Sequence, residues 1–197
     1  YSEVGLGKTH LLQAIGDYCL NNGTAQNVVY ITAEKFISDY ITSIRKWDMA
    51  QFVTTYRSAD LLLVDDIQFF FVTEGSQREF FHTFNTLYQL KRQVVLSSDA
   101  PPSEIPFLEE RLTSRFGCGL VACIEPPGFE TRVAIIKKKA SNRRIDIPDD
   151  VAAYIAAKVD SNIRLLEGAI IKLQGISLLD NSAIDMEMAK LAIGTTT

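Results

Sequence analysis

A short glycine-rich stretch near the start of the sequence restricts the fold of this chain more than any other feature. Gly5 and Gly7 are followed at once by Lys8 and Thr9, and an apolar helical pattern comes next. Glycine lets backbone N–H groups close around an oxyanion because no Cβ stands in the way, and a helix N-terminus adds unpaired donors and partial positive charge. Lys8 would bring a full charge to the outer phosphates, and the Thr9 hydroxyl can ligate Mg²⁺. The stretch therefore predicts a nucleoside triphosphate cradle made by Val4, Gly5, Leu6, Gly7, Lys8, Thr9 and His10.

The stretch departs from the full pattern G-x-x-x-x-G-K-[ST]. Ser2 stands where the first glycine is expected, and Glu3 places a carboxylate in the loop. The alternative interpretation is a glycine-rich turn before an ordinary helix, and these residues alone leave both interpretations open. Because Tyr1 falls inside the strand that should precede such a loop, we also expect the start of this domain to be missing from the sequence.

A second feature is an apolar run that ends in two carboxylates. Residues 61–64 are all aliphatic, and Asp65 and Asp66 follow directly. The run predicts a central strand, and ligands of open α/β sheets lie at the carboxyl ends of their strands. Asp65 would hold Mg²⁺ through water, and Asp66 would polarise an attacking water. The alternative is a strand that merely ends in an acidic turn.

Other segments complete an alternating α/β pattern. Residues 28–31 and 94–96 read as buried strands, and helical patterns alternate with them. This order predicts a parallel sheet with flanking helices. After the last strand, Asp99 can sense a γ-phosphate, or it can simply start the turn before Pro101 and Pro102.

Between the first two strands lies a helical insert, at about residues 34–56. Asp48 is expected to cap its second helix, and Trp47, between the two helices, is expected to pack. Further on, residues 76–79 have the pattern of a capping box, which predicts a helix start at Ser76. Pro126, Pro127 and Gly128 mark a domain boundary, and an all-helical pattern follows.

Two arginines lie four residues apart on one expected helix, and a third opens a later helix. Arg111 and Arg115 share a face. One interpretation is that they form a solvated face or an ion pair with Glu109 or Glu110. The other is an arginine finger that reaches the phosphates bound by a neighbouring copy. Arg164 lies in the first turn of its helix, where a cation opposes the helix dipole, so an anionic partner would explain it.

The composition limits the class of protein. The 197 residues are 47% hydrophobic and carry three cysteines and a formal net charge of −4. Three cysteines without metal-ligand spacing suit reduced thiols in a cytoplasm, and no apolar run predicts a membrane span. The negative charge argues against a broad basic surface for nucleic acid, and the run at residues 137–139 with Arg143 and Arg144 suits a solvated face.

Several blocks stand in an order that resembles the DnaA family of bacterial chromosome replication initiators, which are AAA+ ATPases. The blocks are residues 5–10, 65–69, 79–85, 97–99, 111–116 and 164–168. The resemblance implies an α/β AAA+ P-loop NTPase, with a parallel sheet flanked by helices and a small C-terminal all-helical lid. It implies an AAA+ nucleotide-binding domain over residues 1–127 and a helical lid over 128–197.

The resemblance also implies roles for single residues. Gly5 to Thr9 would be Walker A, and Asp65 and Asp66 would be Walker B, so that Thr9 and Asp65 hold Mg²⁺. The implied catalytic set consists of Asp66, Asp99 as sensor I, Arg115 as the arginine finger acting in trans, and Arg164 as sensor II. The implied ligands are ATP or ADP with Mg²⁺, and the implied partners are further copies of the chain and origin DNA, in the cytoplasm. Hydrolysis would be slow and would switch initiation off.

Departures from the family pattern leave a rival function open. Thr73 and Gly75 stand where family members often carry basic residues that meet single-stranded DNA, so a weak single-strand contact is expected. Ser2 and Glu3 replace loop glycines, so a related regulator or helicase loader with weak or lost ATPase activity is the alternative. No helix-turn-helix module follows Thr197 in this sequence.

Overall fold

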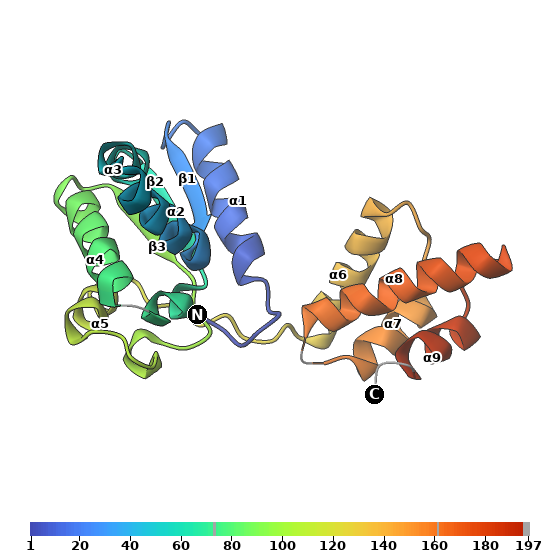
Figure 1. Ribbon diagram of the computed structural model, residues 1–197. Coiled ribbons are helices and arrows are strands. Elements are labelled where there is room, and N and C mark those ends of the chain that lie inside the picture. Colours follow the sequence, from blue (N-terminus) through green and yellow to red (C-terminus); the bar gives the residue numbers. More distant parts are fainter. Residues whose placement is uncertain (73, 161, 195–197) are drawn as a thin grey trace. The chain divides into compact units, whose positions relative to one another are not determined.

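The computed structural model describes residues 1–72, 74–160 and 162–194. The chain forms two compact units (Figure 1). Unit 1 contains residues 1–3 and 7–124, and unit 2 contains residues 4–6 and 125–197. None of the helices in the described ranges is long and apolar enough to cross a membrane.

Unit 1 is built on a parallel sheet whose middle strand is buried on both faces. The strands are β1 (Val28–Thr32), β2 (Leu61–Asp65) and β3 (Gln93–Leu96), in the spatial order β1-β2-β3. Pairing is parallel, with Val28 opposite Leu61 and Leu61 opposite Gln93. Strands buried on both faces read as continuous apolar runs rather than alternating ones, which is why the run in β2 predicted a central strand correctly.

Successive side chains of β2 enter different cores. Leu61 and Leu63 pack with Leu12 of α1 (Lys8–Asn21), whereas Leu62 and Val64 pack on the opposite face. Helices that follow β1 in the sequence cover that opposite face (Figure 1). They are α2 (Ala33–Lys46), α3 (Met49–Arg57), α4 (Glu74–Gln89) and α5 (Glu110–Gly117), together with the 3₁₀ segments η1 (Ile67–Val72) and η2 (Pro102–Glu104).

Aromatic rings fill this larger core. Phe36 lies 5.1 Å from Phe52, 4.9 Å from Tyr56 and 5.6 Å from Phe80, measured between ring centroids. All four side chains are buried. Edge-on and tilted ring pairs are favourable beyond simple area burial, so these contacts fix the helical insert on the sheet.

Two local predictions in the insert and the next helix were wrong. Trp47 does not pack: its side chain is 95% exposed, at a left-handed C-cap with φ 57°. Ser76 does not start a helix, because α4 already begins at Glu74, and the Ser76 hydroxyl instead donates to the Phe70 carbonyl. The predicted cap at Asp48 is confirmed, since its carboxylate accepts from the Gln51 N–H at 3.1 Å.

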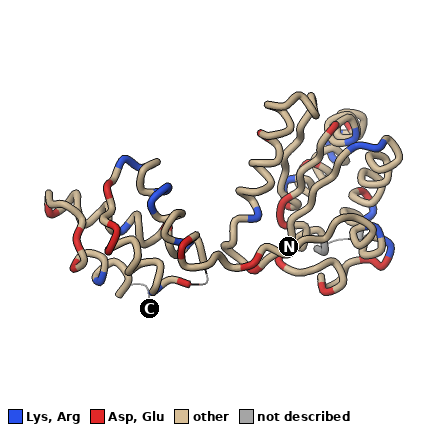
Figure 2. Tube along the Cα trace, turned by 180° about the vertical axis from the view of Figure 1, so that it is seen from behind, with Lys and Arg blue, Asp and Glu red and all other residues tan. Residues whose placement is uncertain are grey.

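Unit 2 is helical, with its own apolar core. Its helices are α6 (Phe129–Asn142), α7 (Asp149–Lys158), α8 (Ile163–Asp180) and α9 (Met186–Gly194). Ile136, Ile155 and Ile170 are fully buried between them. In the basic run, Lys137 pairs with Asp149 and Lys139 with Glu167, and Figure 2 shows basic and acidic segments interspersed along the trace.

Candidate nucleotide site

The glycine-rich loop needs both of its glycines. Gly5 has φ +85° and Gly7 has φ +96°, a region that side chains with a Cβ rarely adopt. A Cβ at Gly5 would also lie 2.1 Å from Asn162 Oδ1, and the Gly5 carbonyl accepts from the Ile163 N–H at 3.1 Å. Gly7 is the N-cap of α1, so the loop leads directly into a helix N-terminus, as the sequence predicts.

The Lys8 ammonium is buried at the start of α1 and held by several oxygens. It donates to the carbonyls of Ser2 at 2.9 Å and Glu3 at 3.1 Å, and it forms an ion pair with Asp99 Oδ1 at 2.6 Å. The Glu3 side chain is exposed. The loop therefore carries a fixed positive charge beside Asp99, and an incoming phosphate would compete with that carboxylate for Lys8.

Thr9 and Asp65 meet at the carboxyl end of β2. The Thr9 hydroxyl donates to Asp65 Oδ2 at 2.6 Å, and the Tyr30 hydroxyl donates to the same oxygen at 3.0 Å. Ser97 donates to the other carboxylate oxygen. Burial and the hydrogen bond to Asp65 raise the pKa of Tyr30 to about 12, so Tyr30 stays a donor at neutral pH. Asp65 is thus buried as an oriented carboxylate.

Asp66, directly after β2, has an unusual backbone conformation. Its φ is 57°, in the left-handed region, and its N–H donates to the Ser97 hydroxyl at 3.0 Å. Residues held in this region cluster at functional sites. Burial, with Asp65 nearby, raises the pKa of the Asp66 carboxyl above its usual range.

Gln68 links two of the predicted site residues. Its amide nitrogen donates to Asp66 Oδ1 at 3.2 Å and to Asp99 Oδ2 at 2.8 Å. In the described part of the chain its buried Oε1 has no hydrogen-bond partner. Sequence reasoning missed both Gln68 and Tyr30, although each stands within three residues of a carboxyl end of a strand.

The donor set fits Mg²⁺ held together with a nucleotide. A hydroxyl and a carboxylate oxygen, at Thr9 and Asp65, are hard oxygen ligands, and Mg²⁺ is usually bound by one or two carboxylates plus substrate phosphates. Over the described ranges, no group of three or more His, Cys, Asp or Glu side chains could hold a metal alone. The residues therefore suit a cation that arrives with its phosphates.

The two arginines of α5 have different surroundings. Arg111 forms an ion pair with Glu109, and its guanidinium carbon lies 4.5 Å above the Phe81 ring centroid. Arg115 is exposed, 5.3 Å from the Tyr88 ring centroid, and within the described ranges no carboxylate pairs with it. Of the two guanidinium groups of α5, that of Arg115 is thus the one that no described carboxylate already pairs with.

The remaining predicted residues lie at exposed positions or in unit 2. Val4 and His10 are exposed, and Leu6 is buried. Arg164 is exposed in the first turn of α8, where its N–H donates to the capping Asn162 side chain at 2.8 Å.

Comparisons with known proteins identify the family of this chain. The family described as the bacterial DnaA ATPase domain matches residues 1–123. The chain belongs to the DnaA family. The chromosomal replication initiator protein DnaA of Caldanaerobacter subterraneus subsp. tengcongensis is 52% identical over 193 residues, covering 98% of this chain and 44% of the relative. DnaA of Thermoanaerobacter sp. strain X514 is 51% identical over the same share.

Solved DnaA structures have the same fold. Domain III of DnaA from Thermotoga maritima is similar with a TM-score of 0.94 and 42% identity, covering 99% of this chain and 82% of that one. A DnaA bound to AMPPCP and single-stranded DNA has a TM-score of 0.78 and 39% identity, over 92% and 56% of the two chains. The chain spans less than half the length of the curated DnaA relatives. The predicted AAA+ fold is confirmed.

Proposed function

We propose that this chain is the ATP-binding and slowly hydrolysing AAA+ core of a replication initiator. One observation carries the proposal: Lys8, Thr9, Asp65, Asp66 and Asp99 converge at the carboxyl end of the sheet, where the glycine-rich loop enters α1. Relatives of this family have been solved with AMPPCP, an ATP analogue. The match over the family's ATPase domain supports the same chemistry in this chain.

The proposed mechanism assigns a separate task to each residue. Lys8 and the loop N–H groups bind the outer phosphates, while Thr9 and Asp65 hold Mg²⁺, which neutralises phosphate charge when bound. Tyr30 and Ser97 keep Asp65 oriented through their hydrogen bonds. Asp66 accepts a proton from the attacking water. The Gln68 amide, which donates to both carboxylates, holds the Asp66 side chain beside Asp99.

The remaining assignments complete the proposed switch. Residues 1–127 form the nucleotide-binding domain and residues 128–197 the lid, from which Arg164 senses the nucleotide. Copies of the chain assemble head to tail through Arg115, on origin DNA in the cytoplasm. A DnaA relative binds single-stranded DNA. This chain's own single-strand contact is proposed to be weak, because Gly75 is uncharged; Thr73, the other position in that argument, lies outside the described residues.

Asp66→Asn separates nucleotide binding from hydrolysis. We expect Mg-ATP affinity to stay within about twofold, because Lys8, Thr9 and Asp65 are unchanged, and hydrolysis to fall by about 10²-fold or more with the lost base. Calorimetric titration and a phosphate-release assay measure the two quantities. Asp17→Asn, at an exposed position on α1, removes the same charge outside the site and should change neither. Equal losses of binding and hydrolysis in Asp66→Asn would remove Asp66 from the role of base.

A further inference from the structure

The buried side chain of Gln77, on helix α4, lies against the loop that leads into helix α5. Its amide nitrogen donates to the Phe107 carbonyl at 3.1 Å, and its amide oxygen accepts from the Glu109 N–H at 3.3 Å. Gln77 is only 4% exposed. A primary amide has both a donor and an acceptor, and here both are used to hold the loop in front of α5.

The loop has a backbone conformation that needs such support. Phe107 has a φ of 60°, in the left-handed region, and its side chain is 86% exposed. A residue with a Cβ is strained in this region and persists there only where its surroundings hold it. Because the Phe107 side chain is exposed, its packing contributes little, and the hydrogen bonds from Gln77 supply the hold.

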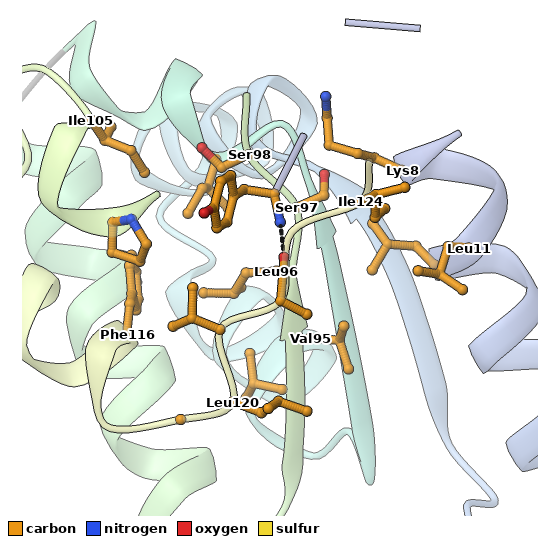
Figure 3. A pocket seen from close by; sticks show the side chains of 18 of the residues that line it. Lys8, Leu11, Val95, Leu96, Ser97, Ser98, Ile105, Phe116, Leu120 and Ile124 are labelled. Carbon is orange, nitrogen blue, oxygen red and sulfur yellow. Dashed lines mark hydrogen bonds between the residues drawn. The ribbon is translucent and has the colours of Figure 1, made fainter. Parts of the chain in front are cut away.

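Apolar contacts fix the chain on both sides of this loop. Ile105 and Phe116 are buried on the same side of a cavity of about 440 Å³ beside β3, as Figure 3 shows. Phe116 also packs on α4, with its ring centroid 5.6 Å from that of Phe84. Apolar contacts are non-directional, whereas hydrogen bonds are directional. We therefore expect the Gln77 amide to fix where α5 starts against α4.

Arg115 directly precedes Phe116 on α5 and is exposed, 5.3 Å from the Tyr88 ring centroid. We propose that Gln77 is a positioning residue for Arg115: by fixing the start of α5, it holds the guanidinium where the nucleotide site of a neighbouring copy requires it. The proposal rests on the proposed role of Arg115 in trans. Displacing a group by about 1 Å can cost roughly 10²-fold in rate, so the start of α5 matters for a charge presented between copies.

Two variants of α4 separate this role from a general effect on the fold. Gln77→Met keeps a buried side chain of similar length and removes both hydrogen bonds to the loop. Thr83→Val is the matched control, because Thr83 is buried on the same helix and its hydroxyl accepts from Arg57 Nε of α3 at 3.4 Å. Gln77→Leu removes the same two bonds as Gln77→Met and replaces it if that variant does not fold.

The first measurement needs neither nucleotide nor assembly. The NMR signal of the Arg115 Nε–H, assigned by its loss in Arg115→Ala, is shifted by the ring current of Tyr88. We expect Gln77→Met to move this signal toward that of an arginine in an unfolded peptide, and Thr83→Val to leave it in place. An Arg115 signal that Gln77→Met leaves unchanged would overturn the proposal.

The second measurement uses mixed copies to show which side of the contact needs Gln77. Arg115→Ala serves as the copy that binds ATP, and Lys8→Ala as the copy that offers Arg115. Hydrolysis by the mixture should fall about tenfold or more when Gln77→Met is added to the Lys8→Ala copy. It should stay within about twofold when Gln77→Met is added to the Arg115→Ala copy, whereas a general loss of stability would act on both sides alike.

The outcomes distinguish the two proposals. Equal losses on the two sides, or no loss on either, would overturn the positioning role of Gln77 and leave the role of Arg115 intact. A mixture that is inactive before Gln77 is changed would overturn the role of Arg115 in trans, and the positioning role with it.

Discussion

Arg115→Ala is expected to abolish ATP-dependent assembly while leaving ATP binding by the single chain intact. The proposed nucleotide contacts of one copy come from Lys8, Thr9 and Asp65, and no hydrogen bond or ion pair among the described residues joins any of them to Arg115. A guanidinium offers forked donors to phosphate oxygens and cannot lose its charge. Supplied from a neighbour, such a group typically accelerates phosphate transfer by about 10³-fold or more, so hydrolysis by the variant should fall by that order under conditions in which the parent chain assembles.

Arg111→Ala is the matched control on the same helix. Arg111 is already paired with Glu109 and stacked on Phe81, so its loss should weaken α5 slightly without removing assembly. Light scattering with ATP measures the assembly of both variants. If Arg115→Ala loses ATP binding as a single chain, the residue acts within its own copy, and the assembly proposal has to be given up.

Mixing two inactive variants makes the test sharper. A Lys8→Ala copy still offers Arg115, and an Arg115→Ala copy still binds ATP. Because a head-to-tail contact is heterologous, junctions of one polarity in the mixture combine an intact nucleotide site with an intact finger. We expect the mixture to recover hydrolysis that neither variant shows alone, and an inactive mixture at all ratios would argue against catalysis in trans.

Lys8→Ala is expected to have the other large effect, on nucleotide affinity itself. The buried ammonium makes contacts to oxygens of 2.6–3.1 Å that a phosphate can take over. Loss of a charged hydrogen-bond donor costs about 3 kcal/mol, or roughly 100-fold in the dissociation constant. Fluorescence titration with a labelled ATP analogue measures the change.

Lys46→Ala is the control for charge, since Lys46 is exposed at the end of α2. Its ATP affinity should match that of the parent chain. Thermal melting of Lys8→Ala without nucleotide checks the fold, because Asp99 loses its ion-pair partner in this variant. An unchanged ATP affinity in a folded Lys8→Ala chain would mean that the phosphates do not sit in this loop.

The sequence predicts the frame of the site because its strongest signals are local. The apolar run in β2 indicates a strand buried on both faces, and parallel strands bring their carboxyl ends to one edge. Asp65 and Asp99 were expected there on this ground, and they lie there with Lys8 and Thr9. Glycine likewise suits positions 5 and 7 of the loop, because side chains with a Cβ rarely adopt their φ values of +85° and +96°.

Features that depend on contacts between distant residues could not be predicted in the same way. Tyr30 reads as one apolar residue of a strand, and only the register of β1 and β2 brings its hydroxyl to Asp65. The left-handed backbone at Asp66 leaves no pattern in the sequence. Trp47 was expected to pack because it is large and apolar, but the backbone turn between α2 and α3 exposes it.

Sedimentation velocity of the chain with ATP, with ADP and without nucleotide, at the same protein concentration and with Mg²⁺, tests the central claim most directly. The proposed switch predicts a single-chain species without nucleotide and with ADP, and larger species with ATP that disappear in Arg115→Ala. A chain that binds ATP and sediments identically in all three conditions would contradict assembly, and a chain that binds neither nucleotide would contradict the nucleotide site itself.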